Sequence, residues 1–187
     1  MKTKKQENST RNSNLRQSLW EFVKFTAIAA IIIIPIRLWV AQPFIVSGSS
    51  MVPNFENGEY LIVDEFSYHF RGPARGEIII FRYPNNPSKF FIKRIIGMPN
   101  ETIEINNGEI RIYNEEFPGG VDIEETYLQN KPMDNLTVTL SSDEYYVMGD
   151  NRSQSSDSRI WGPLQKDLII GRAWMRLWPP NKASIYF

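Results

Sequence analysis

The stretch EIIIFRYPNNPSKFFIKRIIG, residues 77–97, decides the class of the fold. Its two apolar runs, EIIIFRY at 77–83 and FFIKRIIG at 90–97, flank a segment from Pro84 to Pro87 in which proline and asparagine favour a turn. Short apolar runs bounded by turn residues are typical of β-strands rather than of helices. The stretch therefore predicts two strands joined by a turn.

The same pattern recurs along the chain after residue 41. Further candidate strands are FIVSG at 44–48, EYLIVDE at 59–65, TIEI at 102–105, EIRIYN at 109–114, YYVMG at 145–149 and LIIGRAWMRLW at 168–178. Turn residues separate them, for example at Asn57-Gly58 and Asn107-Gly108. Residues 115–140 are acidic and irregular, which indicates a surface excursion with one or two weak strands. We predict a mainly β fold, a coiled antiparallel sheet, for the domain that follows residue 41.

Composition narrows the possible functions. The chain has 187 residues, enough for one domain and an anchor, and its 21 lysines and arginines balance 21 acidic residues. No segment interleaves basic and aromatic residues, so we do not expect nucleic acid as a partner. There is no cysteine and only one histidine, His69, which argues against zinc-type metal sites. We expect neither a metal nor a cofactor.

The N-terminus has the composition of a membrane anchor. Residues 1–16 contain five basic residues and one acidic residue. LWEFVKFTAIAAIIIIPIRLW follows, from Leu19 to Trp39, with an uncharged centre, and its length suits a hydrocarbon core of roughly 30 Å. The sequence predicts a basic, disordered cytoplasmic tail over 1–18, a single transmembrane helix over 19–41 and an extracytoplasmic domain over 42–187.

A cleaved signal peptide is the main alternative for this segment, because its start is basic and its apolar centre is short. Cleavage requires small residues one and three positions before the cut. Ala41 is the only small residue after the apolar centre, and Trp39 lies two positions before it. A retained anchor is therefore favoured. A buried core helix is disfavoured because the isoleucine run has no polar face.

Two segments contain the side chains of a possible nucleophile and base. In SGSSMVPNF, residues 47–55, Gly48 permits a sharp turn just before Ser50. In FFIKRIIGMP, residues 90–99, Lys93 lies in an apolar strand, where burial would lower its pKa and let a neutral amine act as a base. Arg94 points to the opposite face and cannot be deprotonated. Each segment also has a simpler explanation when it is considered alone. The first could be an ordinary loop, and the second could be an edge strand whose two basic residues both reach water.

A third segment, GDNRSQSSDSRIWGPL at 149–164, is dense in short polar side chains. Asp157 and Arg159 suit a structural ion pair, and one of the serines could orient a neutral lysine amine. A solvated polar loop is the alternative.

In this order the anchor and the three segments resemble bacterial type I signal peptidases, over nearly the whole chain. The motifs are Gly-Ser-Ser-Met-Val-Pro, Ile-Lys-Arg-Ile-Ile-Gly-Met-Pro, and Gly-Asp-Asn-Arg with Ser-x-Asp-Ser-Arg. The resemblance implies that Ser50 is the nucleophile and Lys93 the general base, with Ser155 positioning the lysine amine. It also implies that Asp157 and Arg159 form a supporting ion pair, and that RGEIIIF, residues 75–81, helps to shape shallow substrate pockets.

The chain departs from the family pattern at four positions. Asn54 replaces the usual threonine, Glu77 replaces aspartate and Asn100 replaces a glycine, which could alter the local backbone. Gly48 stands where some members have a serine that donates to the oxyanion. The Ser50 backbone N–H is then the expected oxyanion donor, and a second donor remains unassigned.

The resemblance implies cleavage of precursor proteins that carry signal peptides with Ala-x-Ala sites. It places the enzyme in the cell membrane and the catalytic domain outside, in contact with the lipid bilayer. Trp174 and Trp178 could lie in the core or at the membrane surface. Alternatives are a Ser-His-Asp hydrolase that uses His69, a non-catalytic anchored β-domain, and two other Ser/Lys enzymes, a self-cleaving repressor and a pilus-processing peptidase.

Overall fold

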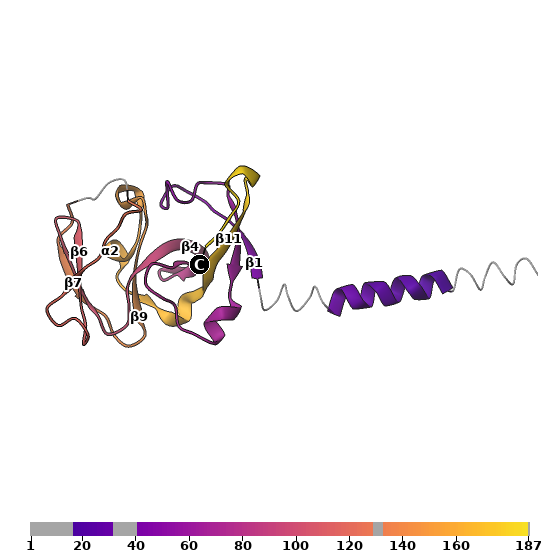
Figure 1. Ribbon diagram of the computed structural model, residues 1–187, viewed down its shortest axis with the longest axis horizontal. Helices are drawn as coiled ribbons and strands as arrows, with labels where there is room; N and C mark the ends of the chain where they lie inside the picture. The colour runs from indigo at the N-terminus through magenta and orange to yellow at the C-terminus, as the bar shows by residue number, and fades with distance from the viewer. Residues whose placement is uncertain (1–16, 32–40, 129–132, 187) are drawn as a thin grey trace, which may run out of the picture. The chain divides into compact units, whose positions relative to one another are not determined.

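A computed structural model describes residues 17–31, 41–128 and 133–186 (Figure 1). The chain divides into two units, residues 1–40 and 41–187. A helix over 17–31 lies in the first unit. Across the described ranges, no helix combines the length and the apolar character needed to cross a membrane. Residues 32–40 of the predicted anchor lie outside the described residues.

The second unit consists mainly of β-strands in two antiparallel sheets (Figure 1). The larger sheet has the order β1-β2-β11-β3-β4-β9-β10, with β12 paired to β11, and the smaller has the order β7-β6-β5-β8. The larger sheet contains β1 (Ala41–Ile45), β2 (Tyr60–Asp64), β3 (Ile78–Tyr83), β4 (Asn86–Gly97), β9 (Glu144–Met148), β10 (Leu164–Gln165), β11 (Ile169–Trp178) and β12 (Ser184–Ile185). The smaller contains β5 (Thr102–Asn106), β6 (Glu109–Tyr113), β7 (Val121–Asp122) and β8 (Leu136–Thr139). The predicted mainly β, antiparallel fold is confirmed.

Short helical turns connect the strands. They are η1 (Phe66–His69), η2 (Arg152–Gln154), α2 (Ser158–Trp161), η3 (Lys166–Leu168) and η4 (Pro180–Lys182). Of these, η2 and α2 belong to the polar segment 149–164. This segment is therefore folded into two short turns rather than extended as a loop.

The smaller sheet shows how the sequence pattern sets the register. Along β5 and β6 every second residue is buried, so the isoleucines at 103, 105, 110 and 112 share one face and form a core. Asn107 and Gly108, both with positive φ, form the two-residue loop between Asn106 and Glu109. Such loops suit the twist of paired strands and favour Asn-Gly.

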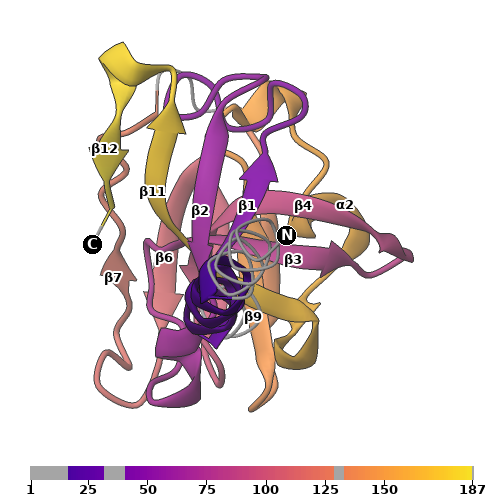
Figure 2. The same cartoon turned by 90° about the vertical axis from the view of Figure 1, so that its right-hand side faces the viewer.

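The strand β11 joins the two halves of the larger sheet. It lies beside β2 (Figure 2), where Arg172 pairs with Asp64, and on its other edge it pairs with β3 through Arg172 and Ile79. The segment that contains Ser50 follows β1, which pairs with β2, whereas Lys93 lies in β4, which pairs with β3. The strand β11 therefore connects the two parts of the sheet that position Ser50 and Lys93.

Three sequence expectations differ in detail. The first strand ends at Ile45 rather than at residue 48, and Gly48 adopts a φ of 93°, which turns the chain out of the strand. The turn after β3 is shorter than predicted, because Tyr83 already pairs with Asn86. Residues 115–140 contain the two weak strands β7 and β8, but Glu125 in this stretch is buried, so it is not only a surface excursion.

Asn100 illustrates how a departure from the family pattern is accommodated. It adopts a φ of 65°, in the left-handed region that glycine enters most readily. Asparagine enters this region more readily than other residues with side chains. The turn after Pro99 therefore keeps a left-handed residue without glycine.

Candidate active site

Ser50 lies in the turn that follows β1. The Gly48 N–H donates to the Asn57 Oδ1 at 3.0 Å, which fixes the start of this turn. Beyond Ser50, the side chains of Met51 and Phe55 are buried in the core beneath β1 and β2. Ser50 itself is only partly buried. The turn is thus anchored on both sides while the hydroxyl remains accessible.

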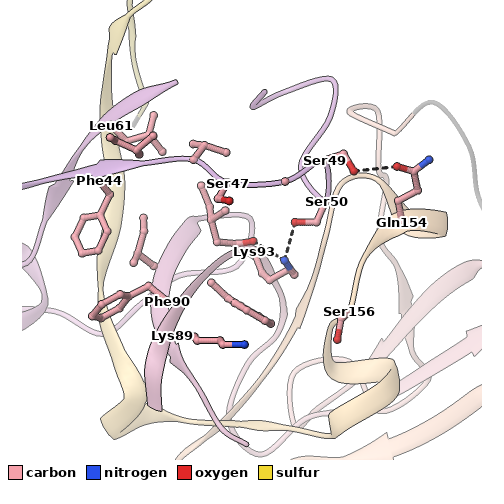
Figure 3. A pocket seen from close by; sticks show the side chains of 16 residues that line it. Phe44, Ser47, Ser49, Ser50, Leu61, Lys89, Phe90, Lys93, Gln154 and Ser156 are labelled. Carbon is pink, nitrogen blue, oxygen red and sulfur yellow. Dashed lines mark hydrogen bonds between the residues drawn. The ribbon is translucent and has the colours of Figure 1, made fainter. Parts of the chain in front are cut away.

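Lys93 lies in β4 with its amine beside this hydroxyl (Figure 3). The Lys93 Nζ donates to Ser50 Oγ at 2.8 Å and to the Ile92 carbonyl at 2.8 Å. The lysine is only 4% exposed. This burial lowers the Lys93 pKa from 10.5 to about 8, although the negative charges of Asp157 and Asp150 act in the opposite direction. A substantial fraction of the amine is therefore neutral near pH 8.

Arg94 points away from Lys93, as the alternation of side chains along a strand predicts. Its Nε and Nη2 donate to the two Asp150 carboxylate oxygens at 2.9 Å and 2.7 Å. The two neighbouring basic residues therefore have different environments. Arg94 is held in a fork-shaped ion pair, whereas the Lys93 amine meets a serine hydroxyl and a carbonyl.

The first part of the polar segment, from Gly149 to Arg159, folds next to Ser50 and Lys93. Asp157 accepts from the Arg159 guanidinium through both carboxylate oxygens, each at 2.9 Å. It also accepts from the Gly149 N–H at 3.0 Å. Arg159 donates further to Asp134 at 2.6 Å. The ion pair expected between Asp157 and Arg159 is present and connects the two ends of the segment.

Ser155 lies close to Ser50 but makes no hydrogen bond to Lys93. It is 8% exposed, and its Oγ has no hydrogen-bond partner within the described residues. A Cβ atom built on Gly149 would lie 2.2 Å from Ser155 Oγ and 2.5 Å from the Ser50 carbonyl oxygen. The structure thus brings Ser155 against the same glycine as Ser50, without the contact to the lysine amine that the family resemblance implies.

Asn151 is a site residue that the sequence reasoning missed. Its backbone N–H donates to the Ser50 carbonyl at 2.9 Å, and its Nδ2 donates to the Ser49 carbonyl at 3.1 Å. Next to this contact, Ser49 Oγ donates to Gln154 Oε1 at 2.9 Å. We call the two Asn151 hydrogen bonds the carbonyl clamp. The only sequence signal for it was the density of short polar residues in the segment.

A cavity of about 590 Å³ opens beside Ser50 and Lys93 (Figure 3). Its apolar lining includes Phe44, Val46, Leu61, Ile80, Phe90 and Ile92. Polar residues, among them Gln154 and Ser156, line another part of it. The nucleophile and base candidates thus border a mainly apolar hollow with a few polar groups, as is typical of binding sites.

His69 does not contribute to this site. It is exposed, and its Nδ1 lies near the backbone carbonyls of Glu65 and Phe66. It is not among the residues that line the cavity. In the parts of the chain that the structure describes, no group of three or more His, Cys, Asp or Glu side chains is arranged to hold a metal ion.

Comparison with known proteins identifies the family. Residues 19–178 match the model of the family described as signal peptidase, peptidase S26. The chain is 35% identical over 177 residues to probable signal peptidase I-1 of Synechocystis, covering 88% of this chain and 87% of that protein. It is 37% identical over 172 residues to signal peptidase I of Leptolyngbya laminosa, covering 88% and 82%.

A solved structure of a signal peptidase I from Enterococcus faecalis is also similar. It is 29% identical, with a TM-score of 0.47, over 55% of this chain and 97% of that chain. The family match and the two relatives cover most of the chain, and the residues matched by the family model, 19–178, include Ser50, Lys93 and the polar segment. The chain therefore belongs to the signal peptidase family, peptidase S26, and is a serine endopeptidase.

Proposed function

We propose that this enzyme removes N-terminal signal peptides from exported precursor proteins, with Ser50 as nucleophile and Lys93 as general base. The observation that carries the proposal is the 2.8 Å contact between Lys93 Nζ and Ser50 Oγ. A serine hydroxyl needs a base within hydrogen-bond reach, and a buried amine with a pKa of about 8 can take its proton near neutral pH.

The reaction begins with a neutral Lys93 amine. Its lone pair accepts the Ser50 proton as Ser50 Oγ attacks the carbonyl carbon of the scissile peptide bond. The backbone N–H of Ser50 donates to the developing oxyanion, and a second donor remains unassigned. The Lys93 ammonium then gives its proton to the leaving amine, so that the C–N bond breaks and an acyl-enzyme remains.

Deacylation repeats these steps with water. The Lys93 amine, neutral again, removes a proton from a water molecule, which attacks the ester carbonyl. The Lys93 ammonium then returns this proton to Ser50 Oγ as the ester C–O bond breaks, so that the acid product leaves and both residues regain their starting states. In this proposal the pair of Asp157 and Arg159 supports the segment next to Lys93, and Ser155 positions the lysine amine. Since Ser155 Oγ has no partner in the described structure, its contact with the amine would have to form when substrate binds.

The cavity supports a preference for small residues before the cut. Its apolar lining surrounds the space next to Ser50, and we propose that residues one and three positions before the cut enter it as Ala-x-Ala. Precursor proteins with such sites are the proposed substrates.

We also propose that the chain is anchored in the cell membrane by residues 19–41, with a cytoplasmic tail over 1–18 and the domain over 42–187 outside. The excess of lysine and arginine before the apolar segment supports this orientation. Protease added to intact cells or spheroplasts should reach the β-domain but not the tail. The opposite pattern would reject the orientation.

Trp178 supports contact between the domain and the bilayer. It is 55% exposed and therefore not a core residue, whereas Trp174 is half-buried. Exposed tryptophan is typical of membrane interfaces. Trp178→Ala should weaken liposome binding, while Phe117→Ala, at an exposed position near the smaller sheet, should not. Equal binding of the two variants would contradict this contact.

The cleavage proposal is tested with a preprotein in detergent. Wild-type enzyme should release a fragment whose new N-terminus, read by mass spectrometry, follows the Ala-x-Ala site. Lys93→Ala should release none, and Lys166→Ala, which removes an exposed lysine, should cleave normally. Cleavage by Lys93→Ala at the wild-type rate would reject the mechanism, and no cleavage by wild type would reject the function.

A further inference from the structure

Glu125 and Arg152 form a buried ion pair outside the proposed catalytic groups. Both residues are almost inaccessible, at 5% and 4% exposed. The Arg152 Nη1 donates to Glu125 Oε2 at 3.0 Å, and its Nη2 donates to Glu125 Oε1. The Tyr127 hydroxyl also donates to Glu125 Oε1, at 2.7 Å. Because removing two charges from water is costly, such a pair is weak evidence for a role in stability alone.

Arg152 connects this pair to the site. Its Nε donates to the Gly149 carbonyl at 3.1 Å, and its own backbone carbonyl accepts from Arg159 Nη2 at 2.5 Å. Asn151, the residue before it, forms the carbonyl clamp on Ser49 and Ser50. Glu125 therefore holds the arginine that fixes the backbone on both sides of the clamp.

The segment that contains Glu125 also contacts the other two parts of the site. The Tyr127 ring lies 4.0 Å from the guanidinium carbon of Arg94, the neighbour of Lys93. The Tyr127 carbonyl accepts from Asn54 Nδ2 at 3.4 Å, in the turn that follows Ser50. One short segment thus touches the strand of the base, the turn of the nucleophile and the segment that clamps it.

We propose that Glu125 is a positioning residue for Ser50. It does not touch substrate. It acts through Arg152, which holds Gly149 and thereby Asn151, so that the clamp keeps Ser50 Oγ within reach of Lys93 Nζ. This role rests on the proposed Ser50 and Lys93 mechanism. Without the Glu125 charge, Arg152 is a buried cation with no counter-charge and moves, and the clamp loosens with it.

The first test compares Glu125→Gln with Asp122→Asn. Asp122 lies three residues earlier and forms an exposed ion pair with Arg111 at 2.7 Å, so its variant removes a carboxylate charge from the same stretch without touching Arg152 or Asn151. At a temperature where both variants are folded, Glu125→Gln should lower kcat on an Ala-x-Ala peptide about 10- to 100-fold with little change in KM, because small misplacements of reacting groups are costly. Asp122→Asn should match wild type.

A second measurement reads the clamp without cleavage. Amide hydrogen exchange of the Asn151 N–H, which donates to the Ser50 carbonyl, should be faster in Glu125→Gln than in wild type and Asp122→Asn. Unchanged kcat or unchanged protection of this amide in Glu125→Gln would overturn the proposal. If wild type cleaved no substrate, the proposed function would fail, while the exchange rates would still show whether Glu125 holds the clamp.

A double variant separates positioning from stability. Replacing a buried ion pair by apolar side chains is often neutral or stabilising, so Glu125→Met with Arg152→Met should unfold at a temperature near that of wild type. It still lacks the hydrogen bond from Arg152 to Gly149, and its kcat should stay low. Recovery of both stability and kcat in the double variant would mean that the pair is merely structural.

Discussion

Gly149 abuts the backbone of Ser50 so closely that no side chain fits between them. A Cβ atom on Gly149 would lie 2.5 Å from the Ser50 carbonyl oxygen and 2.2 Å from Ser155 Oγ. The glycine is held in this place from both sides, since its N–H donates to Asp157 and its carbonyl accepts from Arg152. The turn that contains Ser50 and the polar segment are thus in direct contact.

Gly149→Ala should therefore lower both activity and stability. The methyl group must displace Ser155 or the Ser50 backbone, and overpacking of this kind costs about 1–3 kcal/mol. Gly119→Ala is the control, because nothing lies within 4 Å of its Cβ position and its φ is not positive. Thermal unfolding and peptide cleavage of both variants measure the effect. A fully active Gly149→Ala enzyme would show that this contact can relax without cost.

The proposed dyad predicts a pattern among substitutions. Ser50→Ala, Lys93→Ala and Lys93→Arg should each abolish cleavage of a preprotein while the circular dichroism spectrum remains that of a folded β-domain. Arginine fails because its guanidinium stays charged. The double variant Ser50→Ala with Lys93→Ala should be no worse than either single one, since the two residues act as a unit. Near-normal turnover by Lys93→Arg would end the assignment of Lys93 as the base.

The dependence of activity on pH follows from the lowered Lys93 pKa. Only the neutral amine accepts the Ser50 proton, so kcat/KM should fall as the pH drops below about 8, the pKa to which burial lowers Lys93. The measurement is a pH–rate profile on a soluble peptide with alanine at both recognition positions. An acid limb near the ordinary lysine value of 10.5 would mean that the amine is solvated in the free enzyme.

The same burial predicts a cost in stability. The folded state gives up the Lys93 proton near pH 8 and the unfolded chain near pH 10.5, so wild-type stability rises with pH between these values. Lys93→Met has no such titration. It should be more stable than wild type below pH 8, by on the order of 1–3 kcal/mol, and this gain should shrink toward pH 10.5. Urea unfolding of both proteins at pH 7 and pH 10.5 tests it, and a constant difference would contradict it.

Substrate choice should follow the size of the residue before the cut. If the proposed Ala-x-Ala preference holds, a phenylalanine there must enter a pocket that takes alanine, and overpacking typically costs about 1–3 kcal/mol. Cleavage should therefore be several-fold to more than a hundredfold slower, because about 1.4 kcal/mol corresponds to tenfold in rate. Competing peptides that differ only at this position give the ratio directly. Equal cleavage would exclude a size limit at this position.

The strands could be predicted from the sequence because their patterns are local. Alternating isoleucines in β5 and β6, and Asn107-Gly108 between them, define a hairpin without any long-range information. The proximity of Ser50 and Lys93 was expected only through the family resemblance, since 43 residues separate them. Periodicity specifies which face a side chain occupies, but not which distant segment lies opposite.

The contacts of Asn151 and Glu125 could not be predicted from the sequence. Asn151 donates to backbone carbonyls about a hundred residues earlier in the chain. Every residue has a backbone carbonyl, so the residue types of Ser49 and Ser50 do not indicate this contact. Glu125 lies in an acidic, irregular stretch, where a carboxylate is ordinarily a solvated surface group. Its burial depends on Arg152, which arrives from another part of the chain.

The place of β11 in the larger sheet has a consequence for the order of folding. It lies between β2 and β3, yet it is synthesised after the turn that contains Ser50, the strand that contains Lys93 and the polar segment. Pairings between such distant segments form slowly, because the chain entropy of closing long loops must be lost first. A chain that has not yet emerged as far as residue 178 contains Ser50 and Lys93 but not the complete strand that connects their two parts of the sheet. The larger sheet is therefore complete only when its last long strand is in place.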